Sequence, residues 1–183
     1  MARNRTHILL LRGINLGARK RVPMPELRAL LSAAGFEDVR TYVQSGNVVL
    51  SSGGADSAAL GARCEELIAE RLGFDVDVIV RTEAELADVV ARNPLSDVAV
   101  DPKRYQVSFL ETEPDPEVVA RMAERATDDE RLVAIGRELY AWHPAGVARS
   151  KLWAALAGKE LGVRATARNW TTVTTLLEMA RPS

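Results

Sequence analysis

Cationic and amide side chains gather at three points of this sequence, and each point lies beside a glycine or a predicted helix start. The first is LLLRGINLGARKRVPM (residues 9–24), in which an apolar run ends at Arg12 and is followed by Asn15. Gly13 and Gly17 permit either a tight turn or a close approach of the backbone to a ligand. The loop lacks the Gly-Lys-Ser/Thr ending of a P-loop and the third glycine of a dinucleotide fingerprint. By itself it is explained by a turn.

The second group of cations lies at two predicted helix starts near the end of the chain. Ser150 and Asn169 have the side chains of N-caps, which places Arg149, Lys151 and Arg168 at the positive ends of helices. A cation there is disfavoured by about 0.3 to 1 kcal/mol through the helix dipole. This placement favours an anion bound by helix amides, although the long side chains can equally point outward into water.

The third group surrounds a predicted hairpin tip. Gln44, Ser45 and Asn47 either donate hydrogen bonds to a ligand or satisfy the backbone of their own turn, and Gln44 has no obvious turn role. Taken together, the candidate ligand-binding residues are Arg12, Asn15, Gln44, Asn47, Arg149, Ser150, Lys151, Arg168 and Asn169.

Residues for catalysis or metal binding are scarce. His143 is a conceivable general base without an identifiable partner, and Ser150 beside Lys151 is a poor nucleophile pair because a capping serine is already engaged. Cys64 lies on an apolar helix face and is predicted to be inert core. With one cysteine and two histidines, we expect no metal site and no cofactor. Whether the protein is an enzyme stays open.

The elements that would position these residues follow from hydrophobic periodicity and glycine positions. A strand at 7–13 leads to a helix at 25–35, a hairpin around Gly46, a helix at 57–72 and a strand within FDVDVIV. A helix at 83–92 follows. The second half repeats the order with a strand at 105–111, a helix at 116–126, a hairpin around Gly136, a helix at 150–161, a short extended VRATA and a helix at 169–180.

This order predicts an α+β fold made of two tandem ferredoxin-like β-α-β-β-α-β type subdomains, related by internal duplication. We place the N-terminal subdomain at 1–95, a linker at 96–103 and the C-terminal subdomain at 104–183. The three tryptophans, Trp142, Trp153 and Trp170, are expected to pack in the core rather than to stack nucleic-acid bases.

Composition describes a soluble chain of 183 residues with a net charge of −1. No apolar run is long enough for a membrane span and the N-terminus has no signal segment, so we expect a cytoplasmic protein without a membrane partner. Charge is nevertheless segregated. Residues 1–28 hold seven cations against Glu26, whereas the acidic stretches 56–101 and 111–130 are interpreted as solvated helix faces.

The order of the motifs LLRGINLG, VPM, TYVQSGNVVL, RSKL and RNW resembles a bacterial family catalogued only as domain-of-unknown-function family 1697. The likeness runs from Ile8 to about Leu177. It implies two tandem ferredoxin-like subdomains and carries no established activity. Two positions depart from the family pattern: Ala18 stands where a second glycine is common, and Thr175 stands where lysine is usual.

These observations lead to one main hypothesis and two alternatives. The protein is expected to bind a phosphate-bearing ligand, a nucleotide or a nucleic-acid backbone, at a basic site shared by the two subdomains. It is alternatively an enzyme acting on a small phosphorylated substrate, with His143 or Lys151 as acid–base. The other alternative is a non-catalytic interaction module, for example a homodimer joined along sheet edges.

Overall fold

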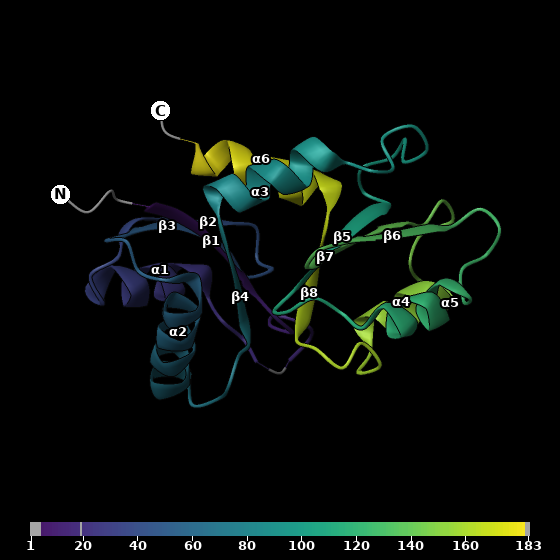
Figure 1. The fold of residues 1–183 in the computed structure, drawn as a ribbon. Helices are drawn as coiled ribbons and strands as arrows, with labels where there is room; N and C mark the ends of the chain where they lie inside the picture. Colours follow the sequence, from purple (N-terminus) through teal and green to yellow (C-terminus); the bar gives the residue numbers. More distant parts are fainter. Residues whose placement is uncertain (1–4, 19, 182–183) are drawn as a thin grey trace. The chain divides into compact units, whose positions relative to one another are not determined.

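The computed structural model describes residues 5–18 and 20–181, which form two compact units (Figure 1). One unit contains the chain up to Asp88 together with the residues from Thr175 onward, and the other spans Val89–Thr174. Described helices are α1 (Met24–Ala33), α2 (Ser57–Leu72), α3 (Glu83–Arg92), α4 (Pro116–Ala123), α5 (Lys151–Ala157) and α6 (Trp170–Ala180). Described strands are β1 (Arg5–Leu11), β2 (Glu37–Tyr42), β3 (Asn47–Ser52), β4 (Val78–Thr82), β5 (Tyr105–Leu110), β6 (Arg131–Ile135), β7 (Glu138–Trp142) and β8 (Ala165–Asn169). The predicted α+β class is confirmed.

The first unit is built on a four-stranded antiparallel sheet with the order β2-β3-β1-β4. The apolar runs of the central strands, residues 8–11 of β1 and 48–50 of β3, are completely buried, as a continuous apolar run predicts. Helices α1 and α2 cover one face of this sheet and contact each other (Figure 1).

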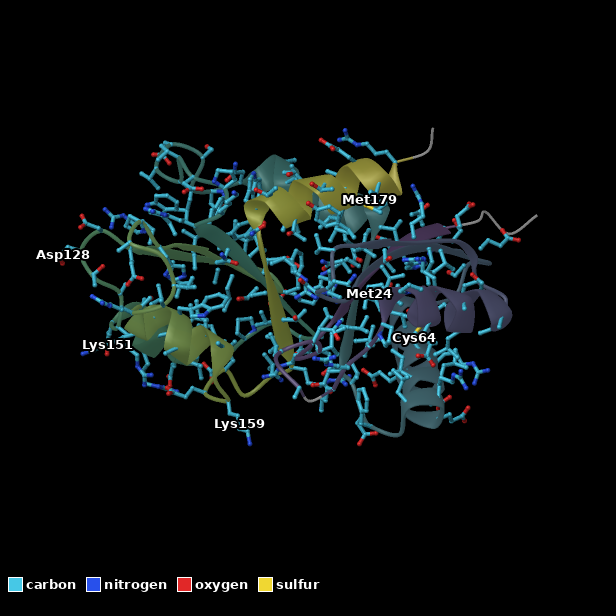
Figure 2. The ribbon with its side chains drawn as sticks, turned by 180° about the vertical axis from the view of Figure 1, so that it is seen from behind. Met24, Cys64, Asp128, Lys151, Lys159 and Met179 are labelled. Atoms are coloured by element: carbon cyan, nitrogen blue, oxygen red, sulfur yellow. The ribbon has the colours of Figure 1, made fainter. Side chains whose placement is uncertain are left out.

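The core of this unit lies between the sheet and its two helices. Met24 at the start of α1 and Cys64 in α2, both labelled in Figure 2, belong to one buried cluster with Leu11 and Val48 from the sheet. Burial raises the pKa of the Cys64 thiol to about 12. The prediction that Cys64 is core is therefore confirmed.

The second unit repeats this arrangement with the strand order β6-β7-β5-β8, again antiparallel throughout. Helices α4 and α5 lie side by side against one face of its sheet (Figure 1). Their core cluster includes Leu110, Leu139, Leu152 and Leu156. Since the element order and the strand order are equivalent in both units, the two sheets fit an internal duplication.

Three element boundaries differ from the predictions. The helix expected at 150–161 ends at Ala157, because Gly158 caps it in an extended conformation and Leu161 then turns back into the core. The expected extended VRATA (residues 163–167) overlaps a full strand, β8, which covers Ala165–Asn169 and pairs with β5. Strand β4 begins at Val78, four residues later than FDVDVIV suggested.

Other predicted boundaries agree to within three residues. The predicted linker at 96–103 contains neither a helix nor a strand, and the predicted division of the chain there stays a prediction. No helix in the described ranges combines the length and the apolar character that a membrane crossing requires.

Candidate functional site

Asn15 shapes the loop that follows β1. Its backbone lies in the left-handed region at φ +55°, and its amide donates to the carbonyl of Lys20. The Asn15 side chain donates from Nδ2 to the Val22 carbonyl at 3.0 Å and accepts at Oδ1 from the Val22 amide at 2.9 Å. Asparagine tolerates this conformation better than most residues because its short amide bonds locally. These two hydrogen bonds of the Asn15 side chain close the loop in the same way as two backbone hydrogen bonds between paired strand residues.

The same side chain joins the loop to the hairpin between β2 and β3. Asn15 Nδ2 donates to the carbonyl of Gln44 at 2.7 Å, and the Leu11 amide donates to the carbonyl of Gly46 at 2.9 Å. Gly46 is packed so closely that an added Cβ would lie 2.6 Å from Leu11 Cβ and 2.7 Å from Ile14 Cδ1. The RGIN and QSGN motifs thus meet in space. We call residues 12–18, 20–22 and 43–46 the loop–hairpin site.

Two cationic residues of the loop, Arg12 and Lys20, contact the segment between α2 and β4. Arg12 Nη1 lies 3.7 Å from Asp77 Oδ2, and the two side chains are 37% and 39% exposed. The Arg12 amide also donates to the Asp77 carbonyl at 3.0 Å, and Lys20 Nζ donates to the Asp75 carbonyl at 2.9 Å. An ion pair this exposed contributes about 0 to 1 kcal/mol. A stronger anion can therefore compete for Arg12.

Backbone strain and exposed apolar side chains occur in the same region. Lys20 and Val43 both have φ near +50°, which is costly for a β-branched residue such as Val43. Leu16 is 77% exposed and Val43 is 51% exposed. Strain and exposed apolar surface persist where the surrounding structure enforces them, and they often mark a ligand surface.

The two hairpin candidates lie differently. Gln44 is exposed, so its amide is available to a ligand. Asn47 is completely buried at the start of β3 and donates from Nδ2 to the Tyr42 carbonyl at 3.2 Å. Asn47 therefore stabilises the hairpin between β2 and β3. Asn15 similarly stabilises the loop after β1.

In the second unit, Ser150 is the N-cap of α5. Its Oγ accepts from the amide of Trp153 at 2.9 Å, as the sequence predicts. Arg149 and Lys151 are exposed on either side of it, and Figure 2 shows Lys151 at the outer surface of α5. Exposure of both side chains fits the alternative of cations solvated by water, and an anion at this helix start stays a prediction.

A buried polar cluster lies behind Ser150 and was missed from the sequence. Ser150 Oγ donates to Glu130 Oε1 at 2.5 Å, and His143 Nδ1 donates to the same oxygen at 2.7 Å. Glu130 is 7% exposed and His143 is completely buried, so the view of 111–130 as a purely solvated stretch is wrong at this residue. Among the described residues, His143 Nε2 has no hydrogen-bond partner.

Glu130 is held as a carboxylate in this cluster. Burial acts to raise its pKa, but hydrogen bonds from Ser150, His143 and the Thr127 amide together hold the pKa below its usual value. A carboxylate of lowered pKa is a weak base, and an imidazole without solvent access cannot exchange protons with a ligand. Through Glu130, the end of β7 at His143 is connected to the start of α5 at Ser150. A structural role fits these contacts better than acid–base catalysis does.

The last predicted motif lies at the end of β8. Arg168 is 8% exposed, and its guanidinium donates to Thr166 Oγ1 and to the Ala167 carbonyl, each at 2.8 Å. Burial lowers the pKa of Arg168 to about 10. Asn169 accepts from the Thr172 amide at 2.9 Å and so caps α6, as predicted. Trp170 stacks on Tyr105 with ring centroids 4.9 Å apart, consistent with a core role.

Metal binding finds no support in the side chains that the structure describes. Within residues 5–18 and 20–181, no three His, Cys, Asp or Glu side chains are grouped so that they could hold a metal ion.

Comparisons with known proteins show a family and a fold. A family model described as "Protein of unknown function (DUF1697)" matches residues 5–140. A solved structure of a conserved bacterial protein from Streptococcus pneumoniae is similar at a TM-score of 0.73 and 22% identity, covering 97% of this chain and 99% of that one. No match was found among curated proteins. The family match includes the whole loop–hairpin site and ends before Arg149.

Proposed function

This chain belongs to the family of proteins of unknown function DUF1697, which brings no activity with it, and we propose that it binds a phosphate-bearing ligand, a nucleotide or a nucleic-acid backbone, at the loop–hairpin site. The predicted resemblance is thereby confirmed, whereas the ligand is our own inference. Membership gives the reason to treat the RGIN and QSGN motifs as one site, since both lie within the matched residues.

One observation carries the proposal. The hydrogen bond from Asn15 to the Gln44 carbonyl fixes a half-exposed arginine, Arg12, and an exposed amide, Gln44, on the two segments that it joins. A preorganised pair of this kind loses little conformational entropy when a ligand binds. Guanidinium is the side chain best suited to phosphate because it donates two parallel hydrogen bonds.

In this proposal each residue has a distinct role. Arg12 and Lys20 supply charge, and Gln44 orients a polar group of the ligand. Asn15 positions the loop and makes no contact with the ligand. Leu16 and Val43 offer apolar contact to the part of the ligand beyond its phosphate.

The test is thermal unfolding against a panel of nucleotides, inorganic phosphates, sulfate and short RNA and DNA strands. A ligand at 100 times its dissociation constant stabilises by about 2.7 kcal/mol, which gives a shift of several degrees at this chain length. Arg12→Ala should abolish the shift. Arg40→Ala, which removes an exposed arginine from β2 of the same unit, should keep it.

Salt separates the two kinds of ligand. Several contacts to a nucleic-acid backbone give a steep loss of affinity with ionic strength, whereas one phosphate group gives a shallow loss. If no phosphate compound shifts the unfolding temperature of the wild-type protein, the proposal is wrong and a protein-interaction role becomes the working hypothesis.

The finer predictions about fold and context belong to the same proposal. We propose a ferredoxin-like plan for each unit, supported by the β-α-β-β-α-β order and the strand order β2-β3-β1-β4. A cytoplasmic location and a homodimer stay predictions, tested by cell fractionation and by sedimentation of the purified chain. The hypothesis that residues of both units bind one ligand also stays a prediction.

A further inference from the structure

Val43 occupies a backbone position at the hairpin tip that valine adopts only at a cost. Its φ is +50°, in the left-handed region where a β-branched residue is an outlier. Glycine and asparagine adopt this conformation readily and are the usual residues of hairpin turns. The Val43 side chain is 51% exposed, so packing within the protein recovers only part of the cost. Contact between this side chain and a bound ligand gives a physical reason for valine here.

A second exposed apolar side chain lies on the adjoining segment. Leu16 is 77% exposed and directly follows Asn15, whose Nδ2 donates to the Gln44 carbonyl at 2.7 Å. Val43 directly precedes Gln44 in the chain. The two apolar side chains are therefore each one residue away from the hydrogen bond that joins the loop to the hairpin, and the loop–hairpin site has apolar surface on both segments.

Polar groups of two kinds accompany this apolar surface. The exposed amide of Gln44 offers one donor group and one acceptor, and the cations of the site are Arg12 and Lys20. A nucleotide has the three matching parts, because its base has apolar faces and an edge of adjacent donors and acceptors, and its phosphate is an anion. Inorganic phosphates and sugar phosphates have no flat apolar face to contact the exposed valine and leucine.

We propose that the loop–hairpin site recognises a nucleobase together with its phosphate. The base contacts Leu16 and Val43 through its faces, and its polar edge forms hydrogen bonds with the Gln44 amide. Arg12 and Lys20 contact the phosphate. The inference rests on the proposed function and adds the chemical class of the ligand. A free nucleotide and a single strand share this chemistry. Val43 becomes a specificity-determining residue that the sequence motifs did not indicate.

The experiment is isothermal titration calorimetry with two pairs of ligands. AMP and ribose 5-phosphate carry the same phosphate with and without a base, and a short single DNA strand is compared with an abasic strand of equal length. We expect the wild type to bind the base-bearing member of a pair at least about tenfold more tightly. In Val43→Asn this ratio should shrink by at least about threefold, because an apolar contact is lost while the cations remain.

Two further variants accompany Val43→Asn. Val100→Asn is the matched control, since it removes an 83% exposed valine from the second unit, and it should keep the wild-type ratio. Leu16→Ala removes the other apolar contact and should also lower the ratio. Asparagine adopts a left-handed backbone more readily than valine, so the urea midpoint of Val43→Asn should not fall below that of the wild type. Impaired folding would then not explain its weaker binding.

The outcomes separate this inference from the proposed function. A wild-type preference for AMP assigns a free nucleotide, and a preference confined to the DNA pair assigns a single strand. Equal affinities within both pairs overturn the nucleobase inference and leave the proposed function standing. Wild-type ratios in both Val43→Asn and Leu16→Ala overturn the role of the apolar side chains. Wild-type protein that binds none of the four ligands, nor any phosphate of the panel, refutes the proposed function itself.

Discussion

Gly46→Ala is the substitution that most directly tests how the loop and the hairpin fit together. Gly46 has φ +76°, so a side chain there costs about 1 to 2 kcal/mol of backbone strain. The new methyl would also lie 2.6 Å from Leu11 Cβ and 2.7 Å from Ile14 Cδ1, both in a packed core. Overpacking of this kind costs about 1 to 3 kcal/mol more. We expect Gly46→Ala to lower the free energy of unfolding by about 2 to 5 kcal/mol in total.

Gly17→Ala is a matched control for this substitution. Gly17 has the same φ of +76°, but an added Cβ there has nothing within 4 Å. The free energy of unfolding of Gly17→Ala should therefore fall only by the cost of backbone strain, about 1 to 2 kcal/mol. Urea unfolding monitored by tryptophan fluorescence and by circular dichroism gives both free energies, and an unchanged slope against urea shows that the unfolded states are comparable.

The difference between the two variants measures the contact between the hairpin tip and β1. An equal loss of stability in Gly46→Ala and Gly17→Ala would refute the reasoning, because it would mean that the tip moves away from Leu11 and Ile14 at no cost. Such a result would also remove the rigid framework on which the proposed site depends.

Further predictions concern the loop, the buried cluster and the thiol. Asn15→Ala should cost about 1 to 3 kcal/mol in urea unfolding, since it leaves the Val22 amide and two carbonyls without their partner, and it should weaken ligand binding without removing any charge. The folded pKa of Glu130 lies below the ordinary value of a glutamate, so its contribution to stability is complete above that ordinary value and is lost as pH falls through the folded pKa. As pH falls below the ordinary pKa of a glutamate, the wild type should lose unfolding free energy more steeply than Glu130→Gln, and equal slopes would contradict this. Ser150→Ala should cost about 1 to 3 kcal/mol by removing the cap of α5 and a bond to Glu130, as measured by urea unfolding. Cys64 should stay unreactive toward a thiol reagent at pH 8 until urea is added, and rapid labelling of the native protein would show that its core is open.

Local patterns in the sequence predicted most of the elements correctly. Continuous apolar runs gave β1 and β5, glycines marked the hairpin turns at Gly46 and Gly136, and helix periodicity gave α2 and α3. The caps Ser150 and Asn169 were also predicted, because capping depends on a residue type and its neighbours within a few positions.

Features that depend on distant partners were not predictable. Strand β8 contains alanines and an asparagine, which favour no sheet, and it is a strand because β5 offers it a hydrogen-bonding edge. Glu130 resembled its acidic neighbours in the sequence, and its burial follows from His143 and Ser150, residues 13 and 20 positions away. No local signal distinguishes a buried carboxylate from an exposed one when its partners lie outside the same element.

The sequence by itself determined which residue types are available for an anion site, and the order of elements that carries them. Only the tertiary structure decided their roles. It turned Asn15 and Asn47 toward the backbone of their own unit, buried Arg168, left Arg12 half-exposed and set Asp77 beside it. The physical reason is that side-chain chemistry is local, whereas burial and charge pairing arise when segments far apart in the chain are packed together.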